Sequence, residues 1–377
     1  MTPELGFWRP AQHDLSTVLG RETVRPTSNA QKEIFSASLT DSDASRAYNH
    51  SISIFLEGPL DVDALYSALL NLLQRHEALR GVFSQDGEEF RVRETRVFSL
   101  PVEDYSLQTE AERQSSYQRL VRNELDHVFD LIQGPLFRAA LVRLAPASWV
   151  LVFNCHHIVV DGWSLKIILD DLPRLYNSLV GDFQLIRALP LKKAASFVDY
   201  LEQAVLREKE LGDDSSRFWK ATFSDSVPLL DLPLDRQRPS MRTYESARED
   251  YKIKRAVYER LKEMGARRGN SQFVTLLSAF SLFLYRITGQ RDHVIGVPAA
   301  GQIKSGLAGL LGHDARVLPV RCQVDAGDSF ESFSKKVGDR FFEAFENQWI
   351  GIPRLIQDLN VQPDPARVPL MSVMFNF

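Results

Sequence analysis

Only two cysteines, Cys155 and Cys322, occur among the 377 residues of this chain. Neither has a framework of further cysteines around it, which excludes a small domain held together by disulfides. Few thiols, one of them inside an apolar run, are typical of a protein that works in a reducing compartment. We therefore expect a cytoplasmic protein.

The sequence also lacks a hydrophobic run that could cross a membrane and an excess of either charge. Its most apolar helical stretch, residues 273–287, is too short for a bilayer core of about 30 Å. Residues 1–25 mix proline, aspartate and arginine with isolated apolar residues, so they predict a linker or docking lead-in rather than a signal peptide. The net charge of −4, with acids and bases interspersed, predicts neither nucleic acid nor membrane as a partner.

Three common catalytic signatures are missing. The chain has no Gly-x-Ser-x-Gly elbow, no phosphate loop that ends in Gly-Lys-Ser/Thr and no dinucleotide-binding Gly-x-Gly-x-x-Gly. A metal site is not predicted either, because the adjacent His156 and His157 lie in a strand pattern and should point to opposite faces.

The feature that stands out is a cluster of polar residues between a predicted strand and a predicted helix. Residues 149–153 form a continuous apolar run, typical of a strand buried on both faces, and His156 and His157 close it. After Gly162, apolar residues recur at three- and four-residue spacing, which predicts a helix with Ser164 placed to cap it.

Only one of the two histidines can take part in chemistry, since they face opposite ways, and the other is structural. Asp161 lies four residues beyond His157, and a buried carboxylate there needs a cationic or hydrogen-bonding partner. On these residues alone, a packed core pair of histidines followed by an Asp-Gly turn is the commoner explanation.

His156, His157, Asp161 and Gly162 form His-His-x-x-x-Asp-Gly, which resembles the signature of the chloramphenicol-acetyltransferase-like acyltransferases. The whole chain is similar to one branch of them, the condensation domains of nonribosomal peptide synthetases. Further segments match that branch in order and spacing, which is more specific than a single motif. These segments are residues 27–35, 75–83, 129–138, 196–200, 232–239 and 364–370.

The resemblance implies an α/β (α+β sandwich) fold of two chloramphenicol-acetyltransferase-like lobes in a V-shaped pseudo-dimer. Length and a hydrophobic content of 44% fit two domain-sized cores. We expect an N-terminal lobe at residues 26–188, an inter-lobe crossing at 189–242, where the sequence is polar and proline-punctuated, and a C-terminal lobe at 243–377. The C-terminal lobe should be incomplete, because the chain stops after a run at 370–377 that is typical of a central strand.

Local patterns predict the elements of both lobes. In the first lobe they predict a helix capped by Asp61, a helix at 110–128 and strands at 135–144 and 149–155. In the second lobe they predict a strand at 248–253, helices at 257–267 and 271–287, and a short strand at 294–297.

The resemblance also implies an activity. The protein would join an acyl group, held as a thioester on the phosphopantetheine arm of a donor carrier protein, to the amine of an aminoacyl group on an acceptor carrier protein. It would bind no cofactor directly, its partners would be acyl or peptidyl carrier proteins, and an adenylation domain would be its neighbour. His157 is the implied base, because a neutral imidazole can accept the proton of an α-amine with a reference pKa of about 8.

Other residues are implied in supporting roles around His157. Asp161 would shape the site through an ion pair with Arg367. Arg75 and Arg80 would support His157, although the residues alone are equally compatible with a solvated helix end.

The start of the helix is expected to border the path of the pantetheine arm. Gly162 would lack a side chain because the arm passes close to its backbone. Trp163 and Ser164 would line the tunnel, although a core aromatic is an equal alternative for Trp163.

Two segments depart from the family pattern Gly-x-x-Val-Asn-x-Leu-Pro-Leu-Arg and from His-Gln-Asp-Tyr-Pro-Phe-Glu. They read Gly-His-Asp-Ala-Arg-Val-Leu-Pro-Val-Arg at residues 312–321 and Asn-Gln-Trp-Ile-Gly-Ile-Pro at 347–353. We interpret His313 and Asp314 as an exposed turn pair rather than a second acid/base pair. The residues at 299–302, Ala-Ala-Gly-Gln, are a third variant. With these three variants the chain resembles the condensation domains of hybrid polyketide-peptide assembly lines, which would suit a polyketide-like acyl donor.

Amide-forming condensation is preferred over the other branches of the superfamily. A cyclisation domain would carry Asp-x-x-x-x-Asp in place of His-His, and an epimerisation domain usually lacks the Arg-His-Glu-x-Leu-Arg that occupies residues 75–80 here. A catalytically weak module that docks or recruits carrier proteins, and an ester-forming acyltransferase, remain the alternatives.

Overall fold

The chain forms two compact units. The computed structural model describes residues 22–95, 97–181, 191–267, 269–301, 307, 309–362 and 364–377. Unit 1 comprises Met1–Val205 and Gln302–Asp314, and unit 2 comprises Leu206–Gly301 and Ala315–Phe377. The division at residue 205 lies inside the predicted crossing. Most of the predicted lead-in, and Gln302 of the variant at 299–302, lie outside the described residues.

The described strands of unit 1 form two β-sheets. β1 (Thr23–Pro26), β4 (Glu89–Val92) and β3 (Gly81–Phe83) form an antiparallel sheet in that order. The second sheet has the order β2 (Asn49–Glu57), β7 (Ser148–His156), β6 (Phe137–Ala145) and β5 (Val102–Asp104), and only its β5–β6 pair is parallel. The helices of this unit are α1 (Asn29–Ser38), α2 (Ser42–Arg46), α3 (Val62–Arg75), the short 3₁₀ helix η1 (Glu77–Arg80), α4 (Glu110–Leu125) and α5 (Gly162–Val180).

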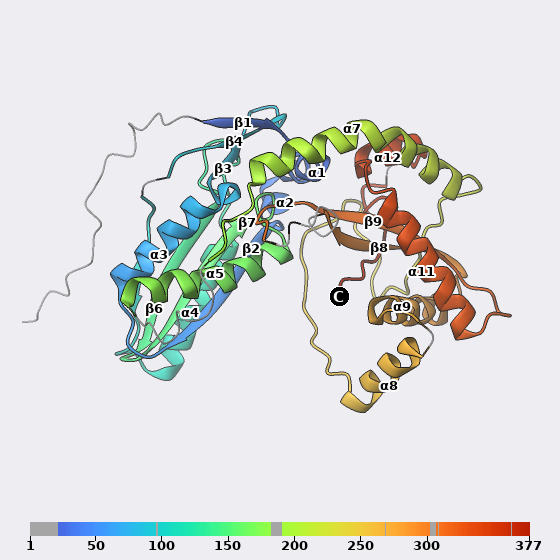
Figure 1. The fold of residues 1–377 in the computed structure, drawn as a ribbon. Helices are drawn as coiled ribbons and strands as arrows, with labels where there is room; N and C mark the ends of the chain where they lie inside the picture. Colours follow the sequence, from blue (N-terminus) through green and yellow to red (C-terminus); the bar gives the residue numbers. More distant parts are fainter. Residues whose placement is uncertain are drawn as a thin grey trace, which may run out of the picture. The chain divides into compact units, whose positions relative to one another are not determined.

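Strands β6 and β7 are buried on both faces, as the apolar run predicted. Leu151 and Phe153 belong to the larger core together with residues of α3 and α5, whereas Val150 and Val152 belong to a smaller core with Leu120 of α4. Alternate strand residues therefore serve two different helix layers. Figure 1 shows α3 and α5 side by side on one face of this sheet and α4 on the other.

The predicted crossing contains a long helix, α7 (Phe197–Thr222), which the sequence analysis missed. Phe197, Leu201 and Ala204 lie in the core of unit 1, and Trp219 lies in the core of unit 2. Their three- and four-residue spacing is helical, but the charged residues between them and the prolines after residue 227 conceal it.

Unit 2 is built on the antiparallel pair β8 (Asp292–Ala300) and β9 (Ala315–Gln323). Its other helices are α8 (Arg255–Ala266), α9 (Gln272–Thr288), α11 (Phe330–Glu346) and α12 (Ile352–Asp358). The predicted helices at 257–267 and 271–287 are confirmed, and Ser271 caps α9 through a hydrogen bond from the Val274 amide.

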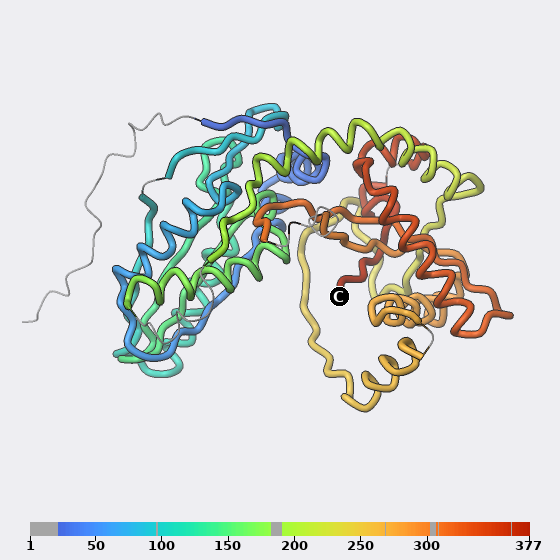
Figure 2. Tube along the Cα trace, in the orientation of Figure 1, coloured from blue at the N-terminus to red at the C-terminus, as the bar shows by residue number. Residues whose placement is uncertain are grey.

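Two strand predictions for the second lobe are wrong: one strand is absent, and the other is reduced to a single bridge. Residues 248–253 form no strand; Tyr251 is 91% exposed, and this stretch lies in the long coil before α8 (Figure 2). The run at 370–377 forms only an isolated parallel bridge between Met374 and Gly296 of β8. Alternating apolar residues make a strand only where a neighbouring strand pairs with them.

Candidate functional site

The predicted polar cluster forms a tight turn in unit 1, between the end of β7 and the start of α5. The Val159 amide donates to the His156 carbonyl (3.1 Å) and the Val160 amide donates to the His157 carbonyl (3.3 Å). The His157 amide donates to the Tyr48 carbonyl (2.7 Å), so the turn stays attached to the sheet. His157 is therefore the first residue beyond β7.

The hydrogen bond of the half-buried His157 ring fixes its tautomer. Its Nδ1 lies 2.7 Å from the carbonyl oxygen of Val160. A carbonyl oxygen only accepts hydrogen bonds, so in the neutral ring Nδ1 carries the proton and Nε2 keeps its lone pair. Nε2 is the atom that can accept a proton from a substrate.

His156 has the opposite character, as the strand alternation predicted. Its side chain has no exposed surface; Nδ1 accepts from the Ile158 amide (3.3 Å), and Nε2 lies 3.5 Å from the Ser38 hydroxyl oxygen. Burial, with the neighbouring His157 as a smaller cause, lowers the pKa of His156 to about 3. We interpret His156 as a neutral structural residue.

Asp161, not Ser164, caps helix α5. The buried Asp161 carboxylate accepts from the amide and from the hydroxyl of Ser164, both at 2.8 Å. It also accepts a longer hydrogen bond from the Asp314 amide (3.4 Å), and the Ser164 hydroxyl oxygen accepts from the Gly312 amide (3.0 Å). Asp161 and Ser164 thus fasten the segment 312–314 to the first turn of α5.

The predicted ion pair between Asp161 and Arg367 stays a prediction. Arg367 belongs to unit 2, where its guanidinium pairs with Asp231 at 2.6 Å and with Asp364 at 3.3 Å. The structure therefore gives Arg367 two carboxylate partners of its own.

The expectation of an exposed turn at His313 and Asp314 is wrong. His313 is only 3% exposed and Asp314 only 1%, and the Asp314 carboxylate accepts a hydrogen bond from the hydroxyl of Tyr200 on α7. Gly312 is required by close approach, because a Cβ there would lie 2.1 Å from the Phe197 ring. The preceding leucines lie in the core of unit 1 and draw the segment inward.

Three imidazole rings meet at the turn. The His157 ring lies edge-on to His50, with centroids 4.1 Å apart, and edge-on to His313, with centroids 4.8 Å apart. His50 lies opposite Cys155 in the β2–β7 register, which makes His157 its diagonal neighbour. Burial, followed by the effect of His157, lowers the pKa of His50 to about 4. His50 was not predictable from local sequence pattern, because only the strand register places it here.

Arg75 and its neighbours fix the helices rather than contact the turn. Arg75 Nε and His76 Nε2 each lie 2.8 Å from an Asp171 oxygen, which ties α3 to α5. Glu77 accepts from the Ser196 hydroxyl and from the Val198 amide, both at 3.0 Å, where α7 begins. The Arg-His-Glu motif therefore joins α3 to α5 and to the start of α7.

Arg80 binds backbone. Its guanidinium donates to the carbonyls of Leu73 (2.9 Å) and Arg93 (2.8 Å). It therefore joins the end of α3 to the residues after β4 and is not a solvated helix end.

The first turn of α5 differs from the predicted tunnel wall at one residue. Gly162 is exposed, and a Cβ built on it would meet no atom within 4 Å. Trp163 is half-buried, with the Lys166 ammonium 6.0 Å from its ring centroid. Ser164 has no exposed surface, so the expectation that it lines a tunnel is wrong. Its hydroxyl is used in the Asp161 network instead.

The two segments that depart from the family pattern contact each other in unit 2. The guanidinium of Arg316, in place of the expected asparagine, donates to the Gln348 carbonyl (3.1 Å) and lies 4.8 Å from the centroid of the Trp349 ring. It also pairs with the half-buried Glu208 at 2.9 Å. A buried cation without such partners would be costly, so the two changes support each other.

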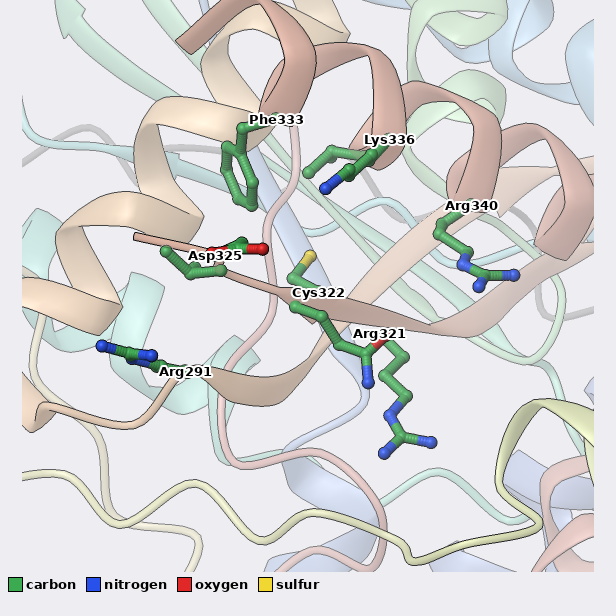
Figure 3. Close-up of a pocket in the computed structure, with 10 residues that line it drawn as sticks. Arg291, Arg321, Cys322, Asp325, Phe333, Lys336 and Arg340 are labelled. Atoms are coloured by element: carbon green, nitrogen blue, oxygen red, sulfur yellow. The ribbon is translucent and has the colours of Figure 1, made fainter. Parts of the chain in front are cut away.

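A pocket of about 610 Å³ lies in unit 2 between β9 and α11 (Figure 3). Among its lining residues, Arg321 is paired with Asp225 and Asp292, and Lys336 is paired with Asp328. Burial raises the pKa of the Cys322 thiol to about 12, which keeps this group protonated and unreactive. Arg321 and Lys336 are thus neutralised by carboxylates, and the Cys322 thiol is not an activated nucleophile.

Within the described ranges, no cluster of His, Cys, Asp and Glu side chains has the arrangement of a metal site. Within the same ranges, no helix is both long and apolar enough to span a bilayer.

The two depressed histidine pKa values predict a loss of stability in acid. His50 and His156 titrate near pH 4 and 3 when folded but near 6.5 when unfolded, so they leave stability unchanged above pH 6.5. As the pH falls from 6.5 towards 4, the unfolded state binds protons first, and stability is lost by up to about 1.4 kcal/mol per pH unit and histidine. Urea midpoints at pH 7.5, 6 and 5 measure the slope, and His50→Phe should reduce it. An unchanged slope in that variant would contradict the assignment.

Sequence comparisons show that this chain belongs to the condensation-domain family and is similar to segments of much longer peptide synthetases. A family model described as Condensation domain matches residues 21–377. A linear gramicidin synthase from Brevibacillus parabrevis is 33% identical over 390 residues, which cover 98% of this chain and 7% of that protein. Phosphinothricin tripeptide synthetase PhsC of Streptomyces viridochromogenes is 32% identical over 331 residues, which cover 87% of this chain and 30% of that protein. The chain thus spans only a small part of the length of these relatives.

Solved structures share the fold. A four-domain nonribosomal peptide synthetase bound to AMP and glycine matches with a TM-score of 0.81 at 19% identity, over 96% of this chain and 27% of that one. The X-domain from teicoplanin biosynthesis, solved in complex with OxyB, matches with a TM-score of 0.78 at 22% identity, over 95% of this chain and 78% of that one. The predicted α/β fold of the chloramphenicol-acetyltransferase type is confirmed.

Proposed function

We propose that this chain, which belongs to the condensation-domain family, transfers an acyl group between two carrier proteins. The acyl group would leave a thioester on the donor carrier and join the amine of an aminoacyl group on the acceptor carrier. The observation that carries the proposal is the tautomer of His157, whose Nδ1 donates to Val160 and leaves Nε2 as a base. The acyl and aminoacyl groups would arrive on phosphopantetheine arms, and an adenylation domain would load the acceptor.

The proposed reaction needs one proton acceptor that later becomes a donor. The amine nitrogen attacks the thioester carbonyl carbon and forms the new C–N bond, while Nε2 of His157 takes the proton from nitrogen. The tetrahedral intermediate then collapses, the C–S bond breaks, and the imidazolium returns its proton to the leaving thiolate. The carrier arms supply proximity, because both reactants are tethered.

Gly162 tests whether an arm passes the start of α5. Its built Cβ meets open space and its backbone is not in the left-handed region, so Gly162→Leu should leave the folded state as stable as before. If the arm passes here, the leucine should obstruct it, and acyl transfer should fall at least about 10-fold, equivalent to about 1.4 kcal/mol. Thermal unfolding and a transfer time course measure the two effects.

The matched control for Gly162 is Gly269, which also has open space around a built Cβ but lies in unit 2. Since Gly269 has a φ of +71°, Gly269→Asn is the suitable control substitution. Full activity in Gly162→Leu would remove Gly162 from the path of the arm.

The proposed function is tested by mixing the protein with an acyl-loaded donor carrier and an acceptor carrier loaded with either an amino acid or a hydroxy acid. Transfer to the amine alone supports amide formation, and transfer to the hydroxyl supports an ester-forming enzyme. Binding of both carriers without transfer would support the recruitment module, which the altered segments at 312–321 and 347–353 keep as the second candidate. A panel of donors tests the predicted polyketide-like acyl group.

A further inference from the structure

We propose that His50 and His313 are positioning residues that hold the His157 imidazole between them in the orientation the reaction requires. The proposal rests on the proposed function for the role of His157, and on the ring geometry for the contact itself. Both neighbouring rings meet His157 nearly at right angles, at 85° for His50 and 86° for His313. Edge-to-face contacts of this kind are the preferred arrangement of aromatic rings.

The two clamp rings come from different parts of unit 1. His50 is carried by β2, and nine residue pairs of β2 and β7, from Asn49 with His156 to Glu57 with Ser148, fix its place beside His157. His313 is carried by the segment that Asp161 and Ser164 fasten to α5. Each ring is therefore anchored independently of the hydrogen bond to Val160.

His157 needs this support because a single hydrogen bond does not fix the orientation of an imidazole ring. Rotation of the imidazole by about half a turn would put Cδ2 in the place of Nδ1 and Cε1 in the place of Nε2, and so remove the Nδ1 bond to Val160. With two rings packed against it at centroid distances of 4.1 and 4.8 Å, the imidazole cannot rotate in this way unless His50 or His313 moves. The backbone around them is held by β2 and by the buried Gly312 and Asp314.

The clamp acts through packing and not through charge. The titratable groups around His157 are the imidazoles of His50, His156 and His313 and the phenol of Tyr48, whose ring centroid lies 6.4 Å away, while the carboxylates of Asp161 and Asp314 fix the adjacent backbone. Aromatic rings without nitrogen should therefore replace both clamp histidines, whereas methyl groups should not.

Nitrogen-detected NMR of the ¹⁵N-histidine-labelled protein tests the clamp directly. The wild-type protein should show the His157 ring with its proton on Nδ1, assigned by the loss of its signals in His157→Ala. In His50→Ala and His313→Ala we expect a mixture of both tautomers and about 10-fold slower turnover at unchanged KM for the acceptor carrier. His50→Phe and His313→Phe should keep the tautomer and at least half of the rate, which also guards against variants that fail to fold.

His127→Ala serves as the control, because His127 contacts Phe129 rather than His157 and should change neither readout. An unchanged tautomer and rate in both alanine variants would overturn the clamp. Phenylalanine variants as slow as the alanine variants, with the tautomer kept, would also overturn it, since the nitrogens would then be needed. If the wild-type protein transfers nothing while the alanine variants lose the tautomer, the proposed function fails and the clamp stands.

Discussion

His157→Ala is expected to slow the transfer of the acyl group by about 100- to 10,000-fold, the usual contribution of a general base. The variant keeps the tethered reactants close together, so a residual rate should remain. The fold should survive, because the His157 side chain is half-buried and its hydrogen bond is to the local turn. Single-turnover time courses followed by intact-protein mass spectrometry measure the rate.

His127→Ala is the control for the loss of an imidazole from unit 1, and it should transfer at the wild-type rate. A His157→Ala variant that stays within threefold of the wild-type rate would show that His157 is not the base. The activity would then rest on tethering alone.

Asp161→Ala should have the largest effect on stability. It removes the cap of α5, worth about 1 kcal/mol, and two further hydrogen bonds that the carboxylate accepts, from the Ser164 hydroxyl and the Asp314 amide, each worth about 0.5–1.5 kcal/mol. The Ser164 hydroxyl keeps the Gly312 carbonyl as an acceptor at 3.0 Å. The segment that carries His313 also loses its hydrogen bond to α5, so transfer should fall with stability. Urea unfolding and the transfer assay, both at pH 7.5, measure the two losses.

Asp61 offers a matched control, since it caps α3 through the same hydrogen bond, from the Ala64 amide at 2.9 Å, but is exposed. Asp61→Ala should cost only about 1 kcal/mol and leave transfer unchanged. If Asp161→Ala lost only as much stability as Asp61→Ala and kept the wild-type transfer rate, the link from Asp161 to the segment 312–314 would contribute nothing to acyl transfer.

The sequence was informative where local pattern and tertiary structure agree. The apolar run before His156 predicted a strand buried on both faces, and the alternation of strand residues predicted that only one of His156 and His157 takes part in chemistry. The choice of His157 came from the resemblance. Asp161 illustrates the limit of such reasoning. Its burial and its need for a partner followed from the motif, but the amide of Asp314, distant in the sequence, was not predictable from spacing.

The remaining errors have one physical cause, which is that packing between distant segments decides burial. His313 and Asp314 follow a glycine and have the composition of an exposed turn, yet neighbouring leucines bury them in the core of unit 1. His50 carries no local signal, because only the register of β2 against β7 brings it to His157. Nothing in the sequence indicates that the altered residues Arg316 and Trp349 contact each other, because their segments are far apart along the chain.

The most direct test of this account is the mass of the acceptor carrier after the wild-type protein is mixed with an acyl-loaded donor and an aminoacyl-loaded acceptor. The account predicts that the acceptor gains the mass of the acyl group, that the donor loses it, and that His157→Ala suppresses the change under the same conditions. Both carriers bound with their masses unchanged, or an equal mass gain with the wild-type and His157→Ala proteins, would contradict it.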